Sequence, residues 1–183
     1  ERFARYLDVD GDGIPYRTLP GVHPKGAYFT RGSGHDKFAK YTEDGDEYQE
    51  VLDRIARKVN SARAAVPAPF IKRREGARVG LVSVGGCHGA CLEALDILEA
   101  DGLPVDYLRV RGFPFADEVK QFLLTHDRTF VVEQNRDGQL RSLLILETEV
   151  DPARLESIRS YSGFPMSAQP IVDGVRAKVQ VHA

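Results

Sequence analysis

Four polar side chains occupy alternate positions directly after an apolar run, and they are Glu133, Asn135, Asp137 and Gln139. Residues 129–132 before them are strand-forming and uninterrupted, which is typical of a buried strand in a covered, mostly parallel sheet. Gly138 helps to end this strand, and Leu140, Leu143 and Leu144 then recur at the spacing of one helical face. The polar residues are therefore predicted to gather where the strand's carboxyl end meets the helix's amino end.

Two kinds of chemistry suit these four residues. Asn and Asp commonly cap the helix that follows a strand. The carboxyl edge of an open α/β sheet is also where ligands and partners usually bind. The sequence favours neither capping nor a partner contact over the other.

Cys87, His88 and Cys91 lie near the expected start of a helix over residues 90–100, where the helix dipole lowers the pKa of a thiol. The spacing is C-x-x-x-C and no second pair of ligands is close in sequence, so a four-ligand zinc site is not expected. Two cysteines are too few for a disulfide scaffold, which predicts a cytoplasmic location.

Residues 85–89, Gly-Gly-Cys-His-Gly, follow a predicted strand and open a helix, a geometry that can seat a phosphate on backbone N–H groups. The loop lacks both G-x-G-x-x-G spacing and the Lys-Ser/Thr pair of a P-loop, so a tight turn with nothing bound is favoured. Residues 8–13 match the first half of a calcium loop, but Leu19 replaces the closing Glu. A solvated acidic turn is therefore favoured there.

The chain has 183 residues and a net charge of −2, with acidic and basic residues well mixed. Nucleic acid and anionic membranes are therefore not expected as partners. No apolar run approaches transmembrane length, and no self-sufficient active site can be assembled from the sequence.

Three segments must position these residues. Residues 1–45 are rich in glycine and proline and are expected to be irregular, with interleaved aromatic side chains that need a surface to bury them. A helix is predicted over residues 46–63, with an apolar face formed by Tyr48, Val51, Leu52, Ile55, Val59 and Ala62. Residues 67–77 are predicted to be a linker.

From residue 78 strands and helices alternate, which predicts an α/β fold of three αβα layers with a mostly parallel sheet.

Four short motifs, in order along the chain, carry a family resemblance. Residues 131–140, VVEQNRDGQL, are similar to the Glu-x-Asn-x-x-Gly-Gln-Leu stretch of 2-oxoacid:ferredoxin oxidoreductase α subunits. The segments DGIPYRTLPG, LRVRGFPF and YSGFPMS at residues 12–21, 108–115 and 161–167 resemble further segments of these subunits. The arm through residues 28–32 looks most like the bacterial 2-oxoglutarate-acting branch. The cysteine-containing loop at residues 87–91 departs from the family pattern.

The resemblance implies the carboxyl-terminal part of an α subunit. Residues 1–66 would complete an upstream pyrimidine-binding domain, and residues 78–183 would form a transketolase C-terminal-like domain. The family's complete enzyme converts a 2-oxoacid, coenzyme A and oxidised ferredoxin into acyl-CoA, CO2 and reduced ferredoxin. It uses thiamine diphosphate, Mg and a [4Fe-4S] cluster, and its partners include a β subunit and ferredoxin.

The resemblance carries no catalytic, cofactor-binding or metal-binding residue onto this chain, which alone is expected to be inactive. The residues expected at domain or subunit contacts are Arg17, Arg31, Glu133, Asn135, Asp137 and Gln139. The alternative is a stand-alone α/β module that binds phosphate or a nucleotide at residues 85–89.

Overall fold

The computed structural model describes residues 3–27 and 32–179. The chain divides into two compact units, Glu1–Ala65 and Val66–Ala183. No helix within the described residues is long and apolar enough to cross a membrane.

The first unit consists of a largely irregular arm and helix α1, Gly45–Ser61, which continues into a short 3-10 turn, Ala62–Ala64. Asp44 caps α1 by accepting hydrogen bonds from the N–H groups of Asp46 and Glu47. The predicted helix is thus confirmed, but its predicted apolar face is not buried. Instead α1 buries Arg54, whose guanidinium donates to the carbonyl oxygen of Gly13 at 2.9 Å.

The second unit is a five-stranded sheet in the order β1-β3-β2-β4-β5. Strands β2 (Val79–Val84), β3 (Val105–Val110), β4 (Arg128–Glu133) and β5 (Leu155–Arg159) are parallel to their neighbours. Strand β1, Phe70–Lys72, pairs antiparallel with β3 at the edge. Part of the predicted linker is therefore an edge strand, a position that tolerates the flanking prolines because one side needs no ladder hydrogen bonds.

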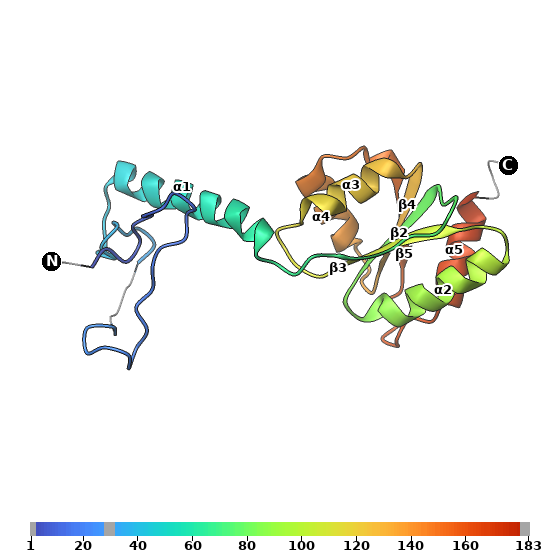
Figure 1. Cartoon of the computed structure of the whole chain (residues 1–183), viewed down its shortest axis with the longest axis horizontal. Helices are drawn as coiled ribbons and strands as arrows, with labels where there is room; N and C mark the ends of the chain where they lie inside the picture. Colours follow the sequence, from blue (N-terminus) through green and yellow to red (C-terminus); the bar gives the residue numbers. More distant parts are fainter. Residues whose placement is uncertain (1–2, 28–31, 180–183) are drawn as a thin grey trace. The chain divides into compact units, whose positions relative to one another are not determined.

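Helices cover both faces of this sheet, as Figure 1 shows, and the predicted three-layer α/β fold is confirmed. Helices α2 (His88–Ala100) and α5 (Gln169–Val179) pack on one face. Helices α3 (Asp117–Thr125) and α4 (Gln139–Thr148) pack on the other. Both faces of β2, β3 and β4 are buried, which explains why these strands are mostly apolar and do not alternate regularly between apolar and polar residues.

Candidate functional site

The loops after β2, β3 and β4 meet at the carboxyl edge of the sheet, because these strands are parallel neighbours. The chain crosses from one side of β2 to the other between β3 and β4. The loops that follow β2 and β4 therefore lead to helices on opposite faces of the sheet. This is the type of crevice in which α/β proteins usually bind ligands.

Glu133, the last residue of β4, has 1% of its surface exposed. Its carboxylate accepts hydrogen bonds from Asn135 Nδ2 at 2.6 Å and from the backbone N–H of Leu140 at 2.7 Å. A third, longer bond of 3.3 Å comes from the N–H of Arg141. The buried charge thus satisfies amide groups in the first turn of α4, where the helix dipole favours an anion.

Asn135 holds the turn between β4 and α4. Its Oδ1 accepts hydrogen bonds from the N–H groups of Asp137, Gly138 and Gln139 at 3.1, 2.7 and 3.2 Å. Gly138 lies in the left-handed region with φ of 67°, which glycine adopts without a steric cost. Glu133 and Asn135 therefore have the capping geometry that was one of the two interpretations of the sequence.

The other two polar residues of this group face solvent. Asp137 forms an ion pair with Arg136, with 2.7 Å between Oδ1 and Nε. Gln139 is exposed and contributes to the wall of a depression at the same edge. Their side chains are free to contact a partner, whereas those of Glu133 and Asn135 are committed to the turn.

The depression has a volume of about 710 Å³ and lies over the end of β2, between the loop after β3 and helix α4. Its apolar lining comes from Val84, Val110, Phe113, Phe115, Leu140 and Leu143. Its polar lining includes Arg109, Arg111, Glu133, Asn135 and Gln139. The two arginines were not among the residues expected at the site, although two cations at alternate positions near the end of a strand are a sequence signal for an anion site.

The glycine loop contributes only Gly85 to this depression. Gly85–Cys87 forms a 3-10 turn, and α2 begins at His88, two residues earlier than predicted. The turn thus precedes the helix directly. A compact turn agrees with the favoured interpretation of this loop.

The two cysteines are buried free thiols. Burial, and after it the charge of Glu133, raise the pKa of Cys87. Burial raises the pKa of Cys91 to about 12. The expectation that the helix dipole lowers a thiol pKa here is therefore wrong, because desolvation of the thiolate outweighs the dipole.

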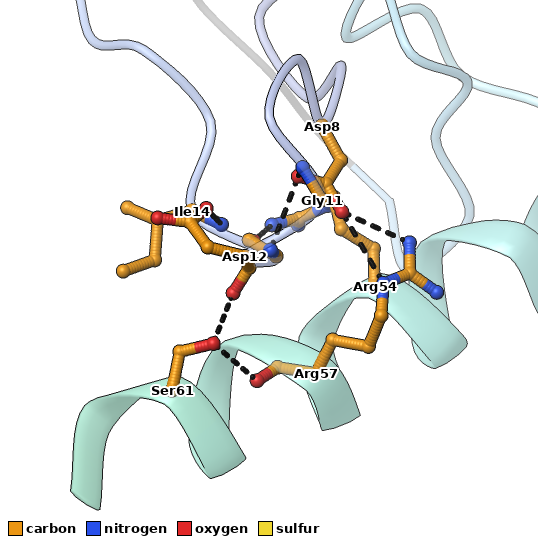
Figure 2. Close-up of polar contacts among 8 residues, drawn as sticks. Asp8, Gly11, Asp12, Ile14, Arg54, Arg57 and Ser61 are labelled. Carbon is orange, nitrogen blue, oxygen red and sulfur yellow. Dashed lines mark hydrogen bonds and ion pairs between the residues drawn. The ribbon is translucent and has the colours of Figure 1, made fainter. Parts of the chain in front are cut away.

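Figure 2 shows that the acidic turn at residues 8–13 is fixed to α1 by polar contacts. Asp8 accepts hydrogen bonds from the N–H groups of Gly11 and Gly13, and its Oδ2 pairs with the Arg57 guanidinium at 3.1 Å. Ser61 donates from its hydroxyl to the carbonyl oxygen of Asp12.

This turn contains the one group of described residues with the donor atoms for a metal ion, namely Asp8, Asp10 and Asp12. Their ligand atoms lie within 4.8 Å of one another. Arg57, however, already occupies one oxygen of the Asp8 carboxylate and compensates its charge. The arrangement is that of a turn docked on a helix.

The remaining two predicted contact residues lie in the first unit. Arg17 is exposed and makes no hydrogen bond or ion pair with the described part of the chain. Arg31 lies outside the described residues.

The sheet order, the two helical layers and the antiparallel edge strand are those of a transketolase C-terminal-like domain. A split-gene transketolase aligns with 71% of this chain and 56% of its own, with a TM-score of 0.51 and 17% identity. This likeness concerns the fold alone.

The similarity that covers almost the whole chain is to a particular class of oxidoreductase subunit. The 2-oxoacid:ferredoxin oxidoreductase subunit alpha of Saccharolobus solfataricus is 25% identical over 180 residues, and subunit alpha of the Aeropyrum pernix oxidoreductase 2 is 28% identical over 179. Each alignment covers 95% of this chain, which spans 28% and 27% of the length of these curated relatives.

A solved 2-oxoglutarate:ferredoxin oxidoreductase from Magnetococcus marinus has the same fold. It matches 97% of this chain and 31% of its own, with a TM-score of 0.82 and 23% identity. Its structure contains 2-oxoglutarate, coenzyme A and succinyl-CoA. No family model matches the chain.

Proposed function

We propose that this chain is a carboxyl-terminal segment of the α subunit of a 2-oxoacid:ferredoxin oxidoreductase of the 2-oxoglutarate type. The observation that carries the proposal is the chain-long similarity to two such α subunits. The complete enzyme would convert a 2-oxoacid, coenzyme A and oxidised ferredoxin into acyl-CoA, CO2 and reduced ferredoxin. The segment alone would be inactive, and a cytoplasmic location is supported by its two unpaired thiols.

The segment's own contribution would be structural. Residues 1–66 would complete an upstream domain of the subunit. The second domain would comprise residues 78–183 together with strand β1, which lies within the stretch 67–77 that was expected to be a linker. The apolar stripe of α1 supports the first assignment, because Tyr48, Leu52, Ile55 and Val59 are exposed on a helix whose other face holds the arm. An apolar stripe of this kind stabilises a protein only when another surface covers it.

The carboxyl edge of the sheet would contribute the second contact. Glu133 and Asn135 would fix the shape of the turn, and Asp137 and Gln139 would present side chains to a neighbouring domain or to the β subunit near the thiamine diphosphate site. Arg17 and Arg31 would tie the arm to the upstream segment or to a second protomer.

The cofactors of the complete enzyme would be held elsewhere. A [4Fe-4S] cluster is bound by four cysteine thiolates, whereas this chain has two cysteines, both buried with raised pKa values. Asp8, the first residue of the acidic turn, is paired with Arg57, so this turn is a poor site for Mg. Thiamine diphosphate would supply the chemistry at the keto carbon when bound by the complete enzyme.

The activity is tested with the full-length protein purified together with its co-purifying partners. Reduction of ferredoxin is measured with 2-oxoglutarate, pyruvate and other 2-oxoacids, with and without coenzyme A. We expect coenzyme A-dependent reduction that is fastest with 2-oxoglutarate. Faster reduction with another 2-oxoacid than with 2-oxoglutarate would refute the 2-oxoglutarate assignment, and no reduction with any of them would refute the oxidoreductase assignment.

The structural role is tested with matched leucines. Leu52 in α1 and Leu124 in α3 are 47% and 46% exposed, and both lie in helices. We expect Leu52→Asp to abolish assembly measured by size-exclusion chromatography with light scattering, and Leu124→Asp to leave assembly intact. Unchanged assembly of Leu52→Asp would refute the role of the α1 stripe.

The proposed contact at the carboxyl edge of the sheet is tested with a single substitution. Gln139→Ala removes an exposed side chain that makes no hydrogen bond in the turn. The hydrogen bond from the backbone N–H of residue 139 to Asn135 Oδ1 is kept. We expect this variant to weaken assembly or turnover of the complex without lowering the stability of the domain. Wild-type assembly and turnover would exclude a contact through Gln139.

A further inference from the structure

The depression at the carboxyl edge of the sheet has an unbalanced positive charge. Arg109 and Arg111 stand at alternate positions at the end of β3, and neither forms an ion pair with a carboxylate of the described residues. Arg109 donates from Nη2 to the Gly85 carbonyl oxygen at 3.3 Å, and Arg111 donates from Nη1 to the Ala68 carbonyl oxygen at 3.4 Å. These long bonds to neutral acceptors leave both guanidinium charges uncompensated.

A second polar feature of the depression is a hydrogen-bond donor of Arg109 that has no acceptor among the described residues. Arg109 Nε is inaccessible to solvent and has no hydrogen-bond partner among the described residues. Its charge also reaches a neighbouring group, because burial and then the positive charge of Arg109 lower the pKa of His88. A buried N–H donor without an acceptor is unfavourable, even though the rest of the Arg109 side chain is only half-buried.

The acidic groups nearby do not neutralise these cations. Glu133 lines the depression, but its oxygens accept from Asn135 and from two amide groups of α4. Asp137 pairs with Arg136 at the outer surface. The two guanidinium groups outnumber the single carboxylate in the lining, which therefore has a net positive charge.

The other half of the wall is apolar and partly uncovered. Phe113 and Phe115 meet edge to face with ring centroids 5.3 Å apart, and Phe113 is 49% exposed. Val84 is also exposed at the end of β2, although the rest of this strand is buried. A flat apolar group placed here would remove these side chains from water.

We propose that this depression binds a small organic anion, in which a phosphate or carboxylate group pairs with Arg109 and Arg111 and a flat apolar body lies against the phenylalanines. The volume of about 710 Å³ is within the usual range for small-molecule sites. The recognition differs from that expected at the glycine loop, because side-chain guanidinium groups rather than backbone N–H groups take the anion. The inference goes beyond the proposed function, which assigns this edge a structural contact and no ligand.

The test is isothermal titration calorimetry on the full-length protein with its co-purifying partners. Phenyl phosphate and benzoate supply an anion with an aromatic body, inorganic phosphate supplies the anion alone, and phenol supplies the body alone. We expect saturable binding of at least one aromatic anion, tighter than both phosphate and phenol, and weakened by added salt. The ranking of phenyl phosphate against benzoate distinguishes a phosphate site from a carboxylate site.

Three variants assign the binding to the depression. We expect Arg109→Gln and Arg111→Gln each to weaken binding about tenfold or more, as for the loss of a charged hydrogen bond. Arg136→Gln removes the same charge from the same edge, outside the lining of the depression, and should leave the affinity within about twofold.

A fourth variant separates binding from folding. Gln139→Glu puts an anion into the wall of the depression while placing it at the first turn of α4, where the helix dipole favours it. We expect weaker anion binding with no loss of thermal stability. The proposal is overturned if no aromatic anion binds saturably, if inorganic phosphate binds as tightly as phenyl phosphate and benzoate, or if Arg136→Gln weakens binding as much as Arg109→Gln.

Discussion

Asn135→Ala is the substitution for which the structure gives the most definite expectation. The variant removes the Oδ1 acceptor shared by three backbone N–H groups and the Nδ2 donor to Glu133. Loss of a capping side chain costs about 0.5–2 kcal/mol. Loss of a hydrogen bond to a buried carboxylate costs about 1.5–3 kcal/mol. Because Asn135 is partly exposed and water can replace some of these bonds, we expect roughly 2–4 kcal/mol of destabilisation.

The assay is urea unfolding followed by circular dichroism, combined with amide hydrogen exchange of residues 138–141. We expect exchange to accelerate at Leu140 and Arg141, because Glu133 loses the partner that orients its carboxylate toward their N–H groups. Gln139→Ala is the control, since it changes the first residue of α4 without removing a side-chain hydrogen bond of the turn, and it should cost less than about 0.5 kcal/mol.

Asn135→Asp adds a second comparison. It keeps an oxygen acceptor for the three amides but replaces the donor to Glu133 with a carboxylate, which places two like charges in contact. At neutral pH we therefore expect it to destabilise the domain as well. If Asn135→Ala unfolded within about 0.5 kcal/mol of the unaltered chain, or if exchange at residues 138–141 were unchanged, the capping account would be refuted.

Three further predictions concern other parts of the chain. Gly13→Ala should destabilise the first unit by about 2 kcal/mol or more in thermal unfolding, because φ is 81° and an added Cβ would lie 2.2 Å from the Lys58 amide nitrogen. The control is Gly11→Ala, which has a similar φ but open space around the added Cβ and should cost about 1–2 kcal/mol. Burial opposes ionisation of Asp106, but hydrogen bonds lower its pKa overall, so its contribution to stability is present above about pH 4 and is lost below it. The acid limb of the unfolding free energy should therefore be shallower in Asp106→Asn, and an unchanged limb would contradict this assignment. Cys91 should resist iodoacetamide at pH 8 in the folded chain and react after unfolding, because burial raises the pKa of its thiol to about 12. Mass spectrometry follows the labelling, and rapid labelling of the folded chain would show that the thiol is accessible.

Much of the architecture could be predicted because it depends on local patterns. The strand ending at Glu133 was recognisable from the uninterrupted strand-forming run over residues 129–132, and the strands over residues 79–84 and 105–110 were recognisable from their mostly apolar residues, since both faces of these strands are covered. The helix near residues 46–63 was recognisable from its apolar periodicity and its charged ends. The alternation of these elements was sufficient to predict a covered parallel sheet.

The edge strand β1 was not predictable in the same way. Its three residues lie between prolines and a charged stretch, and their pairing partner in β3 is more than 30 positions away. A short strand has little intrinsic preference, so its conformation depends on the neighbour that completes its hydrogen bonds.

The sequence by itself determined that polar groups collect at the carboxyl end of β4, because the order of strand, turn and helix is written in local residue preferences. Only the tertiary structure decided what each group does there. It buried Glu133 against the amides of α4, left Gln139 facing solvent, and brought Arg109 and Arg111 from β3 to the same depression. It also reversed the expected shift of the thiol pKa values, because burial depends on packing against distant segments, whereas the helix dipole depends only on neighbours along the chain.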